Sequence, residues 1–164
     1  MNILRLLRKA SFLSPARQLQ LYPPFFLMGV KVIELEENWN RVRLRLPLTM
    51  LSKNMGSSMF GGYVAAVADP IAALACARQF PGCDVWTRTL YVDFIKPGNT
   101  HLELRFEFDP VIKQQIQDEL ASKGRSTPEF EYGLYREDDS LCSRVHCRVA
   151  IRPAGYKKPE RANY

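Results

Sequence analysis

The sequence predicts a single α+β domain in which an antiparallel sheet of about six strands curves around one long helix. Several segments alternate between apolar and charged residues, which is typical of strands that place one face on a core and the other in water. Residues 61–77 are apolar or small on every side except at Asp69, so we expect that helix to be largely buried. No other segment is apolar enough to fill the inner side of the sheet.

The strand pattern recurs along the chain. The segments that show it are residues 29–36, 41–46, 85–95, 101–108, 129–135 and 141–151. In the second of them, arginines alternate with apolar residues, and we expect Arg41, Arg43 and Arg45 to form cross-strand ion pairs with Glu103 and Glu107. Binding of a ligand phosphate by this arginine row is the alternative.

Proline and glycine mark the remaining elements. Pro23-Pro24 is expected to end an N-terminal helical segment that packs on the domain. Asp109-Pro110 is typical of a helix start and Gly124 of a helix end, which predicts an inserted helix at residues 109–124. The expected organisation is therefore a helical segment at residues 1–22, the domain at 23–152 and a disordered tail at 153–164.

Composition and charge limit the classes of protein to which the chain can belong. The chain has 164 residues, 46% of them hydrophobic, and a net charge of +6 that favours anionic partners without choosing among them. No nucleic-acid-binding module is recognisable, and no apolar run approaches the roughly 18 residues of a membrane span. We therefore expect neither nucleic acid nor a membrane span.

Cysteine usage argues against a zinc site and for a reducing compartment. None of the four cysteines shows C-x-x-C spacing, and the chain has two histidines. We expect buried thiols and a cytoplasmic location. A mitochondrial address is the alternative, because the start of the chain carries arginines but no acidic residue before Glu34, as transit peptides do.

Asp69 is the most informative residue of the long helix. It is the only charged residue between Asn54 and Ala77, and a carboxylate buried there must be paired or shifted in pKa. Pro70 directly follows it and removes the N–H that would pair with the Ala66 carbonyl. A carboxylate at this position is explained either by a catalytic role or by a structural hydrogen bond, and the residue alone does not decide between them.

The residues around the start of this helix resemble those of a known family. The pattern Asn54-x-Gly56-x-x-x-Phe60-Gly61-Gly62, with Asp69 seven residues beyond Gly62, is similar to the central-helix signature of hotdog-fold acyl-CoA thioesterases, especially the phenylacetyl-CoA thioesterase subgroup. Val92-Asp93-Phe94-Ile95-Lys96-Pro97-Gly98 resembles that subgroup's next strand. The inserted helix and the Pro-Pro-Phe entry look more like a related hotdog branch of unknown function.

This resemblance implies a hotdog fold and hydrolysis of an acyl thioester, most often an acyl-CoA, with no metal or other cofactor. It implies that Asp69 activates water or attacks the carbonyl, that the Gly61 or Gly62 N–H holds the oxyanion, and that Asn54 orients the water or the carboxylate. A helix N-terminus suits that task because its N–H groups are unpaired. The resemblance also implies a homodimer or homotetramer joined through strand 85–95, with Asn54 of one subunit meeting Asp69 of the other.

One position departs from the family. The subgroup usually has His before the Gly-Gly pair, whereas this chain has Phe60, which can neither hold the thioester by a hydrogen bond nor donate a proton. A non-catalytic acyl-CoA- or lipid-binding protein is therefore the first alternative, and a structural subunit with its active partner on another chain is the second. The residues expected to contact substrate are Met59, Phe60, Thr87 and Thr89.

Overall fold

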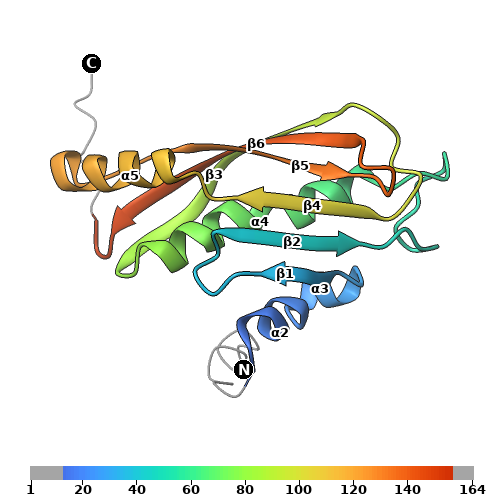
Figure 1. The fold of residues 1–164 in the computed structure, drawn as a ribbon, viewed down its shortest axis with the longest axis horizontal. Helices are drawn as coiled ribbons and strands as arrows, with labels where there is room; N and C mark the ends of the chain where they lie inside the picture. Colours follow the sequence, from blue (N-terminus) through green and yellow to red (C-terminus); the bar gives the residue numbers. More distant parts are fainter. Residues whose placement is uncertain (1–12, 157–164) are drawn as a thin grey trace.

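The computed structural model describes residues 13–156, which form a six-stranded antiparallel sheet with one long helix across one face (Figure 1). Along the chain the elements are α2 (Pro15–Gln20), α3 (Pro23–Leu27), β1 (Lys31–Leu35), β2 (Arg41–Leu46), α4 (Gly61–Gln79), β3 (Cys83–Phe94), β4 (Leu102–Glu107), α5 (Pro110–Lys123), β5 (Glu129–Tyr135) and β6 (Leu141–Pro153). The strand order is β1-β2-β4-β5-β6-β3, so β1 and β3 are the edges. The expected N-terminal helix falls partly on residues 1–12, and most of the expected tail on 157–164, which lie outside the described residues.

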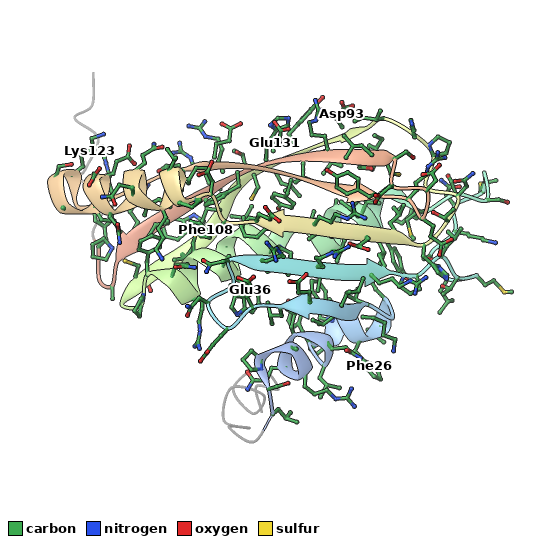
Figure 2. The ribbon with its side chains drawn as sticks, in the orientation of Figure 1. Phe26, Glu36, Asp93, Phe108, Lys123 and Glu131 are labelled. Atoms are coloured by element: carbon green, nitrogen blue, oxygen red, sulfur yellow. The ribbon has the colours of Figure 1, made fainter. Side chains whose placement is uncertain are left out.

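The core lies between the inner face of the sheet and α4. The alternation that predicts the strands also fixes which side chains face inward, and these are buried on every strand except the edges. The inward residues of the central strands include Val42, Leu44, Leu46, Leu102, Leu104, Phe106, Val145, Cys147 and Val149. Phe108 lies below the start of α5, where its ring packs edge-on against Phe130 (Figure 2). The predicted sheet around a central helix is confirmed.

One face of α4 is open in the single chain. Its buried residues recur at every third or fourth position: Val64, Val67, Ala68, Ile71, Ala72, Ala75 and Cys76. Gly62, Ala66 and Asp69 share the opposite, exposed face. The prediction of a largely buried Asp69 is therefore wrong for the isolated chain. Alanine and glycine look like core in a sequence, yet they are equally compatible with an exposed surface that another molecule approaches.

Pro23 and Pro24 begin a helix, α3, that the sequence did not predict, whereas the helix before them, α2, ends at Gln20. They occupy the first turn of α3, where the missing N–H of proline has no intrahelical partner to lose. Both α2 and α3 lie beside the edge strand β1 (Figure 1). The two short helices therefore cover that edge of the sheet and leave the other edge, β3, without a neighbour among the described residues.

The edge strand β3 is long and carries exposed apolar side chains. Among the strands of residues 13–156 it pairs only with β6, and its register shifts between Thr87 and Thr89, so that Arg88 is the extra residue of a β-bulge. Trp86 and Tyr91 are among its exposed large side chains. A free strand edge of 12 residues flanked by apolar surface is a template for pairing with another strand.

The inserted helix α5 has the terminal residues that its sequence predicts. Asp109 is its N-cap and accepts a hydrogen bond from the Val111 N–H at 2.7 Å, and Gly124 ends it with φ +61°. We expect Asp109→Ala to lower the free energy of unfolding by about 1 kcal/mol, because one helix N–H loses its acceptor. Urea denaturation measures this. Gln117→Ala, an exposed change in the middle of the same helix, is the control, and equal losses for both variants would contradict the capping role.

Candidate active site

The chain enters α4 through a loop that its own side chains hold in shape. The Asn54 carboxamide donates to the Ser58 hydroxyl at 3.0 Å and accepts from the Ser58 N–H at 3.1 Å. The next N–H, that of Met59, donates to the Gly98 carbonyl at 2.8 Å. Gly98 allows this approach, because a Cβ there would lie 2.9 Å from the Cβ of Met59. The start of α4 is thus fixed against the segment that leaves β3.

The first two N–H groups of α4 have no hydrogen-bond partner within residues 13–156. The Phe60 carbonyl accepts from the N–H groups of Tyr63, at 2.9 Å, and Val64, at 3.4 Å, and no side chain caps the helix. The N–H groups of Gly61 and Gly62 are left free. Because the helix dipole places partial positive charge at the same point, this end of α4 can hold a negatively charged oxygen.

Two aromatic rings lie against these glycines. A Cβ on Gly61 would lie 3.0 Å from Cζ of Phe94, and a Cβ on Gly62 would lie 2.4 Å from Cε1 of Phe60. Both rings are about half exposed. The Gly-Gly pair is therefore needed for packing as well as for the approach of any carbonyl group, and the rings stand beside the free N–H groups.

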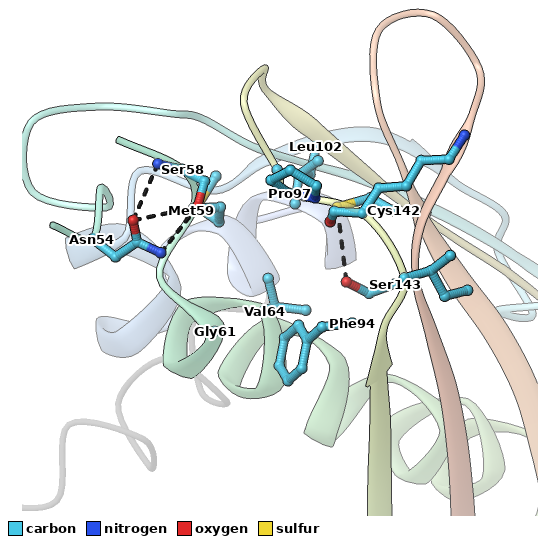
Figure 3. Close-up of a pocket in the computed structure, with 13 residues that line it drawn as sticks. Asn54, Ser58, Met59, Gly61, Val64, Phe94, Pro97, Leu102, Cys142 and Ser143 are labelled. Carbon is cyan, nitrogen blue, oxygen red and sulfur yellow. Dashed lines mark hydrogen bonds between the residues drawn. The ribbon is translucent and has the colours of Figure 1, made fainter. Parts of the chain in front are cut away.

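A cavity of about 300 Å³ opens beside Gly61 (Figure 3). Asn54 and Ser58 form one wall, and Cys142 and Ser143 of β6 form the opposite wall. Ser143 is completely buried, and its hydroxyl donates to the Cys142 sulfur at 3.8 Å. The cavity can therefore receive a small group next to the free N–H of Gly61.

Asp69 lies away from this cavity. It follows Gly62 by two helical turns, which is about 10 Å along the axis. It is not among the residues that line the cavity, and its carboxylate has no hydrogen bond or ion pair to any residue from 13 to 156. A single chain therefore does not bring the carboxylate to the N–H groups of Gly61 and Gly62.

Two hydroxyl groups reach the backbone of the turn that carries Asp69. Thr87 Oγ1 donates to the Asp69 carbonyl at 2.8 Å, and Tyr132 Oη donates to the Ala68 carbonyl at 2.8 Å. Burial raises the pKa of the Tyr132 phenol, which keeps its proton in place. Thr89 follows the bulge and is exposed, without a hydrogen bond from its hydroxyl within the described chain.

The structure thus divides the predicted site residues into two groups. Asn54, Met59 and Gly61 line the cavity, with Phe60 and Gly62 next to it. Asp69 and Thr87 lie together further along α4. Phe94, Ser143 and Tyr132 also belong to these two places but were not singled out from the sequence. The one available signal was Ser143, the polar residue in the inward row that continues through Val145, Cys147, Val149 and Ile151.

The outer face of the sheet holds paired charges. Arg41 contacts Glu107 at 3.2 Å and Arg43 contacts Glu103 at 2.5 Å, so the predicted cross-strand ion pairs are confirmed for these two arginines. Arg45 pairs instead with Glu137. Within residues 13–156, no group of three or more His, Cys, Asp or Glu side chains is placed to hold a metal ion. In the same part of the chain, no helix is both long and apolar enough to span a membrane.

Comparison with known proteins identifies a family and a fold. A family model described as Domain of unknown function (DUF4442) matches residues 13–151. A search among curated proteins finds no match.

Several solved structures share the architecture. A protein of unknown function from Pseudomonas aeruginosa, described as a probable thioesterase, has a TM-score of 0.70 and 18% identity, with 79% of this chain and 86% of that chain covered. A protein of unknown function from Chlorobaculum tepidum has a TM-score of 0.69 and 15% identity, with 92% and 94% covered. A thioesterase from Haemophilus influenzae has a TM-score of 0.64 and 13% identity, with 87% and 91% covered. At these identities the likeness establishes a shared fold, which is the hotdog fold.

Proposed function

We propose that this chain, which belongs to the family described as Domain of unknown function (DUF4442), hydrolyses acyl thioesters, with acyl-CoA as the substrate class. The observation that carries the proposal is the pair of free N–H groups at Gly61 and Gly62 beside an open cavity. The descriptions of two structures with the same fold as thioesterases support the same reaction class.

In the proposed reaction, the thioester carbonyl oxygen accepts hydrogen bonds from these N–H groups. The Asp69 carboxylate takes a proton from water as the water oxygen attacks the carbonyl carbon. The tetrahedral oxyanion then collapses, the C–S bond breaks and the thiolate takes up the proton. Direct attack by Asp69, through an anhydride that water opens, is the other form of the reaction. A backbone donor aimed at the oxyanion contributes roughly 3–4 kcal/mol.

This reaction requires two copies of the chain. An attacking atom must stand about 3 Å from the carbonyl carbon, whereas Asp69 is about 10 Å along the helix from its own Gly62. Gly61 packs on Phe94 at one end of β3, and Asp69 on Thr87 further back along that strand. Antiparallel pairing of two β3 edges would bring the Gly61 end of one chain alongside the Asp69 turn of the other. We propose a homodimer joined in this way, and a tetramer of two such dimers remains part of the proposal.

The remaining predicted residues take supporting roles in the proposal. Asn54 would orient water or carboxylate from across the dimer, although in the single chain its carboxamide is engaged by Ser58. Met59 and Phe60 would contact the acyl group, and Thr89 the substrate near the edge. All four cysteines are free thiols, which supports the proposed cytoplasmic location.

Binding without hydrolysis is the second candidate function, and the position of Phe60 favours it. Its ring occupies the space above Gly62 and has no group that donates a proton. In that case the cavity would hold an acyl-CoA or a lipid without turnover, and the substitution of Asp69 by Asn would leave binding unchanged or tighter.

The test is an assay of free thiol release from a panel of acyl-CoAs, aromatic and C4 to C16, with purified dimeric protein. We expect hydrolysis of at least one member of the panel. Binding of the same compounds without thiol release would contradict the proposal and favour the binding protein. Release that occurs only after co-purification with a homologous chain would instead identify a structural subunit.

A further inference from the structure

The turn of α4 that carries Asp69 lacks one of its own hydrogen bonds. Pro70 stands inside the helix and has no N–H, so the Ala66 carbonyl loses the donor that an α-helix normally supplies four residues later. A helix interrupted in this way is free to bend at that turn. The direction of the Asp69 side chain therefore depends on what else holds the turn.

Two side chains of the sheet hold it. The hydroxyls of Tyr132 and Thr87 donate to the successive carbonyls of Ala68 and Asp69, each at 2.8 Å. Tyr132 belongs to β5 and Thr87 to β3, and these strands lie on opposite sides of β6. The turn is thus attached to the sheet at two points, which resists both bending and rotation of α4 about its axis.

Each of these hydroxyls has a single proton, and that proton is engaged by a backbone carbonyl. Thr87 therefore has no proton left to donate to water or substrate, and Tyr132 is too deeply buried to meet either. Their contribution has to pass through the backbone of the turn. The ring of Tyr132 has a separate structural role, because it packs edge-on against Phe106 at 5.4 Å.

We propose that Tyr132 and Thr87 are positioning residues, which attach to the sheet the turn that Pro70 weakens and so hold the Asp69 carboxylate in one direction. The effect on turnover rests on the proposed thioester hydrolysis. The attachment of the turn to the sheet does not depend on that function. An experiment can therefore refute the effect on turnover and the attachment independently.

Variants that remove only a hydroxyl test the catalytic part. We expect Tyr132→Phe and Thr87→Val each to lower kcat for acyl-CoA hydrolysis about tenfold, because a small displacement of a reacting group is costly, while KM changes less than about twofold. Thr87→Ser keeps the hydroxyl and should retain most of the activity. Tyr135→Phe removes a hydroxyl from the same strand as Tyr132 and should leave kcat unchanged.

A merely structural role would lower the melting temperature without separating kcat from KM in the folded protein. Unchanged kcat in both Tyr132→Phe and Thr87→Val, with an active wild type, would overturn the positioning role. So would failure of Thr87→Ser to retain activity.

Amide hydrogen exchange tests the attachment without any substrate. Ala72 and Ala73 donate to the same two carbonyls in the helical pattern, so their exchange should become about tenfold faster in Tyr132→Phe and Thr87→Val and stay unchanged in Tyr135→Phe. Unchanged exchange at both amides would overturn the inference, whether or not the protein is an enzyme. A wild type that hydrolyses no thioester would refute the proposed function and the effect on turnover, and the exchange result would still decide the attachment.

Discussion

Asp69→Asn is expected to lower the rate of thiol release from acyl-CoA by about 10³-fold, the loss typical of removing a general base. The substitution keeps the size of the side chain but removes its ability to take a proton or to attack a carbonyl. Asp69 is exposed and its carboxylate has no hydrogen bond or ion pair within residues 13–156, so the change should leave folding intact. Thiol release and direct binding of acyl-CoA, measured on the same preparation, should show lost turnover with retained binding.

Asp118→Asn is the matched control for this variant. Asp118 is another exposed aspartate, on α5 and not on the proposed β3 interface, and the same change there should not alter turnover. Hydrolysis that survives in Asp69→Asn at the wild-type rate would contradict the assignment of Asp69. The carboxylate would then have a role that does not involve the substrate.

Gly61→Val is expected to reduce hydrolysis by about 10²-fold or more, the scale of losing one oxyanion donor. A Cβ at this position already lies 3.0 Å from the Phe94 ring, so the valine methyl groups must displace that ring and fill the approach to the N–H. The same steady-state assay measures the effect. Both kcat and kcat/KM should fall, because the donor acts on the transition state.

Ala77→Val is the control for a larger side chain on the same helix. Ala77 is exposed near the far end of α4, and its replacement should change neither activity nor folding. If Gly61→Val hydrolyses acyl-CoA as fast as the wild type, the oxyanion is held elsewhere and the Gly-Gly pair serves only the packing of Phe60 and Phe94.

The strands could be predicted from the sequence because their alternation is strong. Residues 41–46 and 129–135 were placed with the bounds that the structure has, since one buried and one solvated face leave a pattern of period two. The helix α3 was missed because Pro23-Pro24 was interpreted as a break, whereas proline is also favoured in the first turn of a helix. A Pro-Pro pair fits both the end and the start of a helix, and only the positions of the following elements decide between the two.

The site was less predictable than the fold. Asp69 and the Gly-Gly pair were singled out by a charge in an apolar helix and by a resemblance, but the exposure of Asp69 depends on which face of α4 the sheet covers. Tyr132 reaches Ala68 only because β5 lies near α4 in the folded chain, at a separation of 64 residues. Sequence spacing contains no information on such contacts.

The most direct test of an active site shared between two chains mixes two variants that are each expected to be inactive, Asp69→Asn and Gly61→Val. After subunit exchange, half of the dimers contain one chain of each kind, and one of the two sites in such a dimer combines an intact Gly61 with an intact Asp69. We therefore predict recovery of about a quarter of the wild-type hydrolysis rate. Native mass spectrometry would confirm the mixed dimers. No recovery in a sample that contains them would contradict a site shared between two chains.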